Sequence, residues 1–181
     1  MIARATEADV PRILEIANWA AVHLPANFAL APESLDEWLA TFRATQARYP
    51  WLVWREDGRI LGFAKGSPHR ARAAYAWTAE VTVYLDDAAR GRGLGTQLYA
   101  RLIPLLARQG YVTLLAGITT GNDASEKLHA KAGFVRCATF HRTGWKFDRW
   151  HDVGYWELHL IPPDAPPRPL RTVDEVWTTA S

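Results

Sequence analysis

The chain has 181 residues, 49% of them hydrophobic, with 21 basic and 19 acidic side chains and a formal net charge of +2. This length suits one compact domain with a sizeable core, and the near balance of charge argues against nucleic acid or an anionic membrane surface as a partner. With the single cysteine Cys137, no secretory signal at the start and no apolar run near the roughly 18 residues of a membrane span, the sequence favours a cytoplasmic protein.

Two amphipathic helices are predicted in the first fifty residues. Thr6 and Asp9 form a capping-box-like pair before apolar residues at helical spacing, which predicts the first helix. Ser34 and Glu37 repeat that signal, and the second helix should run over about 35–47 until a Tyr-Pro pair stops it.

Three strands should follow. Residues 51–55 and 60–65 flank an Asp-Gly pair at 57–58, which is typical of a tight hairpin turn. Residues 77–85 alternate between an apolar face and a polar face, and the polar face carries Glu80.

A basic, glycine-rich loop follows this strand and leads into a third helix that Gly110 closes. A loop between a strand and a helix can hold phosphate on backbone N–H groups at the positive end of the helix. A Walker A loop needs Lys and then Ser or Thr after its last glycine, and a Rossmann fingerprint needs glycine at position 96 or 98. The sequence has neither.

The remaining elements complete a mixed sheet. We expect a strand over about 112–118, a short helix from Asn122 or Asp123 to Gly133, and two strands near 134–141 and 151–160 that pair around residues 144–150. The order predicts an α/β (α+β) fold with a largely antiparallel sheet flanked by helices. It should form one domain over 1–161, followed by a proline-rich extension over 162–181 that wanders over the surface or a partner.

Two segments resemble the GNAT acetyltransferase superfamily. Arg90, Gly93 and Gly95 match its pyrophosphate loop, and the segment from Asn122 to Phe134 is similar to its second coenzyme A segment. Closer matches to the phosphinothricin N-acetyltransferase branch cover about residues 2–161. They include Asn27-Phe28, Arg48-Tyr49-Pro50-Trp51-Leu52-Val53, Ala71-Arg72, Ala74-Tyr75, Trp77-Thr78, Glu80, Thr82-Val83-Tyr84 and Trp150-His151-Asp152-Val153-Gly154.

The resemblance implies acetyl-CoA as co-substrate and an amino-acid-like amine as acceptor. Backbone groups of Val83 and Leu85 would pair with the pantetheine arm. The other coenzyme-binding residues that it implies are Arg90, Gly91, Arg92, Gly93, Leu94, Gly95, Thr96, Asn122 and Ser125. Members of this branch are commonly homodimers, and the aromatic cluster over residues 145–156 could cover a subunit interface or belong to the core.

The chemistry of acetyl transfer to an amine requires a base, because an amine is mostly ammonium at neutral pH. Glu80 stands in mid-strand among apolar and aromatic residues, where desolvation would raise its pKa toward a useful value, and by itself it could equally be a hydrogen-bonded strand residue. The resemblance favours Glu80 as the general base. His129, at a family position, could be a second base, the acid for the coenzyme A sulfur or a packed helical residue.

Two arginines precede the strand that carries Glu80. Arg72 could clamp a carboxylate or phosphinate or could equally belong to a solvated basic loop, whereas Arg70, where the family commonly has lysine, is expected to be solvated. The resemblance adds Phe28, Tyr75, Thr82 and Tyr84 as pocket residues.

No metal is expected, since thioester chemistry needs none. Two alternatives stay open: an acetyltransferase for another amine, such as a polyamine or a protein N-terminus, and a non-catalytic sensor of acyl-CoA.

Overall fold

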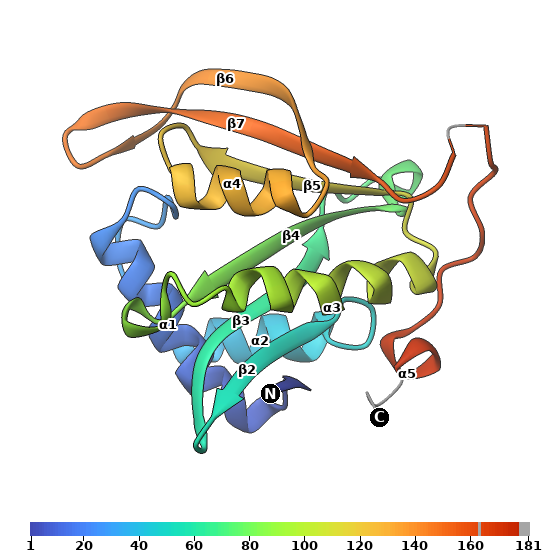
Figure 1. Cartoon of the computed structure of the whole chain (residues 1–181), viewed down its shortest axis with the longest axis horizontal. Helices are drawn as coiled ribbons and strands as arrows, with labels where there is room; N and C mark the ends of the chain where they lie inside the picture. Colours follow the sequence, from blue (N-terminus) through green and yellow to red (C-terminus); the bar gives the residue numbers. More distant parts are fainter. Residues whose placement is uncertain (163, 178–181) are drawn as a thin grey trace.

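The computed structural model describes residues 1–162 and 164–177. Seven strands of this described part form one sheet in the order β1-β2-β3-β4-β5-β7-β6, and every neighbouring pair is antiparallel except β4 and β5 (Figure 1). The predicted mixed fold with a largely antiparallel sheet is therefore confirmed.

The bounds of the elements are as follows. The strands are β1 (Ile2–Arg4), β2 (Trp51–Glu56), β3 (Arg59–Pro68), β4 (Thr78–Leu85), β5 (Thr113–Thr119), β6 (Val135–Lys146) and β7 (Arg149–His159). The helices are α1 (Val10–His23), α2 (Leu35–Thr45), α3 (Leu94–Gln109), α4 (Asp123–Lys131) and α5 (Val173–Val176), and the 3₁₀ turns are η1 (Glu7–Asp9), η2 (Ala73–Tyr75) and η3 (Asp87–Ala89). Within the described residues, no helix is long and apolar enough to cross a membrane.

Helices cover both faces of the sheet, and each face has its own hydrophobic cluster. On one face, Leu98 and Leu102 of α3 are fully buried in the cluster that includes Leu52 of β2. On the other face, Ile13 of α1 lies in the cluster that includes Val53. Leu52 and Val53 are neighbours in the chain, so the alternation of a strand sends one side chain to each cluster.

The helix starts follow the capping chemistry of the sequence. Ser34 accepts a hydrogen bond from the Glu37 N–H at 3.3 Å, and its own N–H donates to the Glu37 carboxylate at 3.1 Å, so α2 has the predicted capping box. The pair of Thr6 and Asp9 also forms a box, but it opens the short turn η1, and α1 begins only at Val10. The first α-helix therefore begins one turn after the capping box that the sequence predicted.

The last hairpin is longer and tighter than the sequence indicated. We expected its strands to end near 141 and to resume at 151, but β6 continues to Lys146 and β7 begins at Arg149. Phe147 and Asp148 make the turn with φ of 52° and 54°. Two positive φ values in a two-residue loop match the twist of the strands, although neither residue is a glycine.

The described residues 164–177 of the proline-rich extension are held against the rest of the molecule (Figure 1). The Trp77 Nε1–H donates to the Arg168 carbonyl at 2.7 Å. Val173 and Val176 of α5 are buried, and Val176 joins the cluster on the α3 face. The extension thus contributes to the core, and the predicted boundary at 161 stays a prediction. Residues 163 and 178–181 of that extension lie outside the described residues.

Candidate active site

A fork in the sheet creates the main cleft of the described structure. The parallel strands β4 and β5 pair only from Thr78 to Glu80 and from Thr113 to Leu115, and they diverge beyond these positions. A cleft of about 890 Å³ opens between them, lined by Val81 to Leu85 on one side and Ala116 to Thr119 on the other. The edge of β4 that faces this cleft has no neighbouring strand to pair with, so it can pair with an extended ligand.

The glycine-rich loop closes one end of the cleft. Gly91 and Gly93 have φ of 75° and 76°, and Gly93 is the N-cap of α3. Side chains rarely adopt this conformation, so the two glycines are required by the backbone itself. The free N–H groups at the start of a 16-residue helix and its dipole favour an anion at this position.

Gly95 is needed for a different reason, which is close packing. A Cβ atom at this position would lie 2.5 Å from Leu128 Cδ1 of α4. The absence of a side chain therefore lets α3 approach α4 closely beside the cleft.

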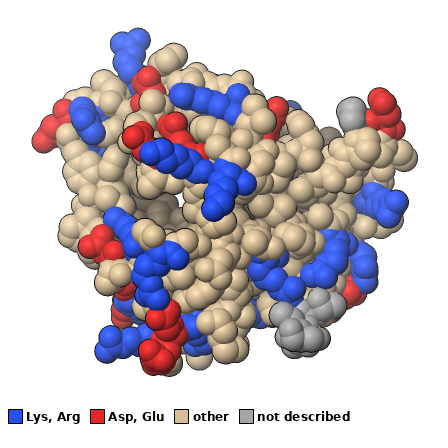
Figure 2. All heavy atoms as spheres, viewed as in Figure 1, with Lys and Arg blue, Asp and Glu red and all other residues tan. Residues whose placement is uncertain are grey.

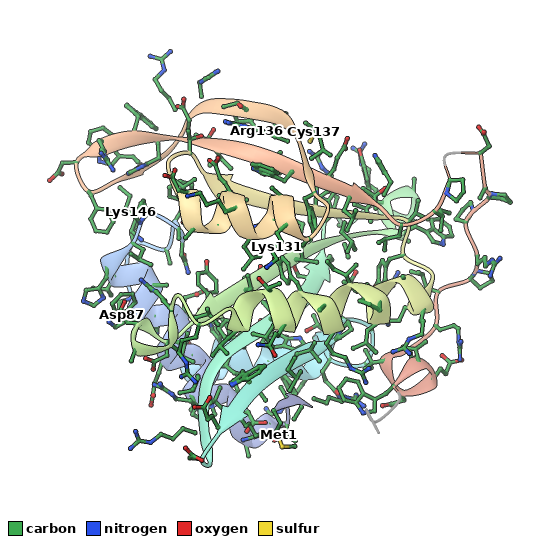
Figure 3. The ribbon with its side chains drawn as sticks, viewed as in Figure 1. Met1, Asp87, Lys131, Arg136, Cys137 and Lys146 are labelled. Carbon is green, nitrogen blue, oxygen red and sulfur yellow. The ribbon has the colours of Figure 1, made fainter. Side chains whose placement is uncertain are left out.

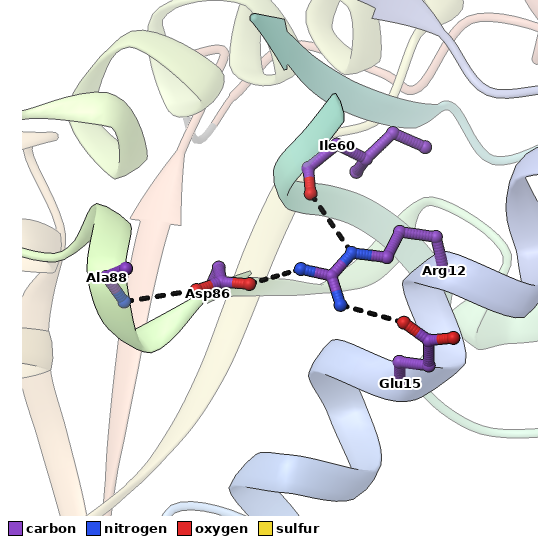
Figure 4. A network of polar contacts seen from close by, with 5 residues as sticks. All are labelled: Arg12, Glu15, Ile60, Asp86 and Ala88. Atoms are coloured by element: carbon purple, nitrogen blue, oxygen red, sulfur yellow. Dashed lines mark hydrogen bonds and ion pairs between the residues drawn. The ribbon is translucent and has the colours of Figure 1, made fainter. Parts of the chain in front are cut away.

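A network of ionic contacts anchors the start of this loop (Figure 4). Asp86 follows β4 and accepts a hydrogen bond from the Ala88 N–H at 3.0 Å, which caps η3. Arg12 of α1 forms an ion pair with the Asp86 carboxylate and donates to the Ile60 carbonyl at 3.3 Å and to Glu15 at 2.8 Å. The loop is thus connected to α1 and β3.

Helix α4 forms the opposite wall of this end. The Asn122 side chain caps it by accepting a hydrogen bond from the Ser125 N–H at 3.3 Å, as the sequence predicted. Arg90, Lys127 and Lys131 also line the cleft. Figure 2 shows a hollow on this face with lysine and arginine side chains beside it. This end of the cleft is suited to an anionic ligand.

The structure brings most of the predicted coenzyme residues to the cleft. Those that line it are Val83, Leu85, Arg90, Gly91, Gly93, Gly95, Thr96, Asn122 and Ser125. Arg92 instead forms an ion pair with Glu56 at 2.7 Å, and Leu94 is buried at 3% exposure.

Glu80 stands at the fork itself. It is the last residue of β4 that pairs with β5, opposite Leu115, and its side chain is 40% exposed. Its Oε1 lies 2.8 Å from Nδ1 of His69, which follows the end of β3. Glu80 does not line the cleft, whereas its neighbours on the same strand face, Thr82 and Tyr84, do. No motif or spacing in the sequence indicated His69.

His129 is a buried wall residue of the cleft, with 4% exposure. The Tyr99 hydroxyl donates to its Nε2 at 2.9 Å, and its Nδ1–H donates to the Ser125 carbonyl at 2.8 Å. Burial lowers the pKa of His129, so the imidazole is neutral at neutral pH. Both ring nitrogens are already hydrogen-bonded.

The other predicted acceptor residues lie outside the lining of the cleft. Phe28 packs over Gly144, where an added Cβ would lie 2.6 Å from its ring, and lies 6.0 Å from the His151 ring. Arg72 and Tyr75 are exposed on the loop after β3. Arg70 was expected to be solvated. It is exposed, but its guanidinium also lies 5.6 Å from the centre of the Tyr75 ring.

Residues 24–30 form a loop at the other end of the cleft, and three side chains fix it in place. The Tyr84 hydroxyl donates to the Ala26 carbonyl at 3.2 Å, and burial raises the pKa of Tyr84 to about 12. The Thr119 hydroxyl donates to the Pro25 carbonyl at 2.6 Å. The third side chain is Lys146, at the tip of the last hairpin (Figure 3).

Lys146 is 5% exposed, and its ammonium group donates to backbone carbonyls of this loop and of α1. Nζ lies 2.6 Å from the Asn27 oxygen and 2.9 Å from the Ala29 oxygen, and it also contacts the Ala21 oxygen. The sequence carries no local signal for this contact, because the partners are more than 100 residues apart.

No group of three or more His, Cys, Asp and Glu side chains that could hold a metal ion occurs within residues 1–162 and 164–177.

Comparison with known proteins identifies relatives along nearly the whole chain. Residues 13–134 match the acetyltransferase (GNAT) family. The chain is 38% identical to the phosphinothricin N-acetyltransferase of Streptomyces viridochromogenes over 172 residues, or 95% of this chain and 93% of the relative. It is 37% identical to the L-methionine sulfoximine/L-methionine sulfone acetyltransferase of Salmonella typhimurium over 163 residues, or 90% and 95% of the two chains.

Solved structures agree with this assignment. The structure of a Salmonella typhimurium protein with its cofactor acetyl-CoA superposes with a TM-score of 0.88 at 36% identity, and it covers 92% of this chain and 96% of that one.

The sequence similarity extends beyond residue 161. The 172 residues aligned with the Streptomyces relative exceed the 161 residues before the extension. The similarity therefore reaches into the proline-rich segment, which the sequence analysis had left outside it.

Proposed function

The chain belongs to the acetyltransferase (GNAT) family and is an acetyl-CoA-dependent N-acetyltransferase, and on this basis we propose that it acetylates the primary amine of a small amino-acid-like acceptor. The names of the relatives support this substrate class, since they act on phosphinothricin and on methionine sulfoximine or sulfone. The single observation that carries the proposal is the position of Glu80 at the fork, where the coenzyme cleft meets the polar face of β4.

The residues of the cleft fit the coenzyme. The start of α3 with Gly91 and Gly93 offers N–H groups for the pyrophosphate, and the free edge of β4 near Val83 and Leu85 offers backbone groups for the pantetheine arm. Acetyl-CoA supplies the activated acetyl thioester when bound. We propose that the reaction needs no metal.

The acceptor reaches this thioester from the polar face of β4. We assign Glu80 as the general base that takes a proton from the ammonium group of the acceptor, directly or through water. The free amine then attacks the acetyl carbonyl without an acyl-enzyme, the C–N bond forms as the thioester C–S bond breaks, and coenzyme A leaves as the thiol after its sulfur takes up the second proton of the amine. Phe28, Arg72, Tyr75, Thr82 and Tyr84 remain the proposed acceptor residues. His129 remains a proposal as base or acid, and its lowered pKa favours the neutral base form over the acid form.

Release of free thiol from acetyl-CoA tests the function directly. The panel contains phosphinothricin, methionine sulfone, methionine sulfoximine, the common amino acids, polyamines and a peptide with a free N-terminus. Turnover confined to amino-acid-like acceptors supports the proposal. Turnover only on polyamines or the peptide would keep acetyl transfer but exclude an amino-acid-like acceptor. Tight coenzyme binding without any turnover would favour a non-catalytic sensor of acyl-CoA.

The assigned base has its own test. Glu80→Gln should lower kcat by about 100-fold or more, with the dissociation constant of coenzyme A unchanged. The matched control is Glu157→Gln on β7, which removes a carboxylate of the same sheet outside the cleft lining and should keep full turnover. Full turnover in Glu80→Gln would exclude Glu80 as the base.

The cellular setting follows the family resemblance. We propose a cytoplasmic homodimer. The aromatic side chains that support an interface are exposed on the last hairpin: Phe140 at 53%, Trp145 at 51%, Phe147 at 50% and Trp150 at 56%. Sedimentation at micromolar concentration tests the dimer.

A further inference from the structure

We propose that His69 is a positioning residue for acetyl transfer: its Nδ1–H donates to Oε1 of Glu80 and holds the carboxylate so that the second oxygen is free for the acceptor amine. The inference rests on the proposed function of Glu80 as the base.

The contacts of the imidazole fix the direction of this hydrogen bond. Arg70 Nε lies 3.3 Å from Nε2 of His69. A guanidinium N–H can only donate, so Nε2 must carry the lone pair and the ring proton of neutral His69 must be on Nδ1. The Nδ1–H therefore points at Glu80 Oε1, 2.8 Å away. The three side chains form a directed series from Arg70 through His69 to Glu80.

Packing holds the imidazole in this orientation. The His69 side chain is only 15% exposed, although it follows the end of β3. The Tyr75 ring lies edge-on to it, with ring centres 5.7 Å apart and planes at 76°. Ser67 of β3 stands opposite Glu80 of β4, so the strand register brings the start of this loop beside the carboxylate.

Glu80 needs such a partner because it is half-exposed. At 40% exposure, a glutamate side chain without a partner samples several rotamers, and most of them direct its oxygens away from a bound acceptor. One hydrogen bond from a packed ring selects among these rotamers and leaves Oε2 as the working oxygen. Among the described residues, the charged and titratable groups with contacts to His69 are Glu80 from β4, Arg70 from its own loop and Tyr75 from η2.

Two substitutions separate the hydrogen bond from the bulk of the ring. His69→Phe keeps a flat ring but removes the donor. His69→Gln keeps an N–H for Glu80 and an oxygen that can accept from Arg70, but it cannot titrate. We expect kcat to fall about tenfold in His69→Phe and to return to within about threefold of wild type in His69→Gln.

The division of the effect between kcat and KM provides a readout that a purely structural role would not give. Loss of the donor should misdirect the base but leave both binding sites intact, so His69→Phe should lower kcat while the KM for acetyl-CoA and for the acceptor stays within about twofold of wild type. The matched control is His159→Phe, which removes the histidine of another His–Glu pair, 3.5 Å apart, outside the cleft lining. It should change neither kcat nor either KM.

Two outcomes would overturn the proposal. One is an unchanged kcat in His69→Phe. The other is an equal loss of kcat in both variants, since the loss would then not depend on the donor. If Glu80→Gln loses turnover but His69→Phe keeps the kcat of wild type, only the role of His69 is refuted. If Glu80→Gln keeps full turnover, the assignment of Glu80 as the base is refuted as well.

The tautomer of His69 tests the geometry without turnover. In protein labelled with ¹⁵N-histidine, its NMR signals at pH 8 should show the proton on Nδ1. A wild-type ring protonated on Nε2 would contradict the proposed direction.

Discussion

The two ends of the cleft are built in different ways. The end near the start of α3, which we call the coenzyme wall, consists of residues 85–96 and α4, and its form is set mainly by positive-φ glycines, a helix cap and the close packing of α3 on α4. The other end, which we call the acceptor wall, combines residues 24–30 and the hairpin tip over 144–151. A few polar contacts between distant segments hold the acceptor wall together.

The two walls should therefore be sensitive to different kinds of substitution. The coenzyme wall depends on backbone geometry and close helix packing, so an added side chain should harm it. The acceptor wall depends on single donors that satisfy buried carbonyls, so removal of one donor should loosen a whole loop. Substitutions at Lys146, Gly95 and Thr119 should each affect the binding of one ligand and spare the other.

The largest effect is expected from Lys146→Met on the acceptor wall. Methionine keeps the length but leaves the carbonyls of Ala21, Asn27 and Ala29 without their donor. The free energy of unfolding should fall by about 3 kcal/mol, and the KM for the acceptor should rise about tenfold with unchanged coenzyme affinity. Urea unfolding, kinetics and calorimetry measure these quantities. Lys131→Met, at an exposed lysine, is the control for stability, and an unchanged unfolding energy in Lys146→Met would contradict the prediction.

The next effect is expected from Gly95→Val on the coenzyme wall. The new side chain would meet Leu128, which has an atom 2.5 Å from the Cβ position. Over-packing should cost about 2 kcal/mol of stability and weaken coenzyme A binding about tenfold, while the KM for the acceptor stays the same. Ala100→Val, at an exposed position of α3, controls for the lower helix propensity of valine. Equal losses for both ligands would show that the walls are not independent.

A smaller effect is expected from Tyr99→Phe, which removes the donor to His129 Nε2. The unpaired nitrogen should lower the free energy of unfolding by about 1.5 kcal/mol. If His129 only supports α4, kcat should change less than about twofold. A tenfold fall of kcat with a new limb in the pH profile would instead support His129 as a base.

The smallest effect is expected from Thr119→Val, which keeps the shape of the side chain but removes the hydroxyl that donates to the Pro25 carbonyl. Stability should fall by about 1 kcal/mol, and the KM for the acceptor should rise about twofold. The matched control is Thr143→Val, because the exposed Thr143 hydroxyl donates to the Phe140 carbonyl at 3.0 Å. A larger loss of stability in Thr143→Val than in Thr119→Val would mean that the burial of the hydrogen bond does not determine how much stability is lost.

The same difference between the two walls explains which site residues could be predicted from the sequence. Gly91, Gly93 and the cap at Asn122 were identified from the sequence because their roles depend on backbone geometry and neighbours a few residues away. The alternation over β4 likewise predicted that Glu80, Thr82 and Tyr84 share a face. Local chemistry therefore predicted the coenzyme wall and the strand beside it.

The sequence could not predict contacts that depend on how distant segments meet. No motif or spacing in the sequence indicated His69, which lies beside Glu80 because of the strand register. Lys146 gave no signal at all, since a lysine in a hairpin is usually solvated. The capping box at Thr6 was predicted, but local chemistry does not set the type of helix that follows it.

The buried helix α5 has a consequence for how the protein can be made and shortened. Val176 completes a cluster whose other members, such as Leu105 and Leu106, are synthesised about seventy residues earlier. A nascent chain therefore displays apolar surface beside α3 until α5 leaves the ribosome, and it is prone to aggregation during that interval. A fragment cut at residue 161 would keep this surface exposed permanently. For crystallography or directed evolution, the expression boundary should accordingly lie beyond Trp177, with any affinity tag added after it.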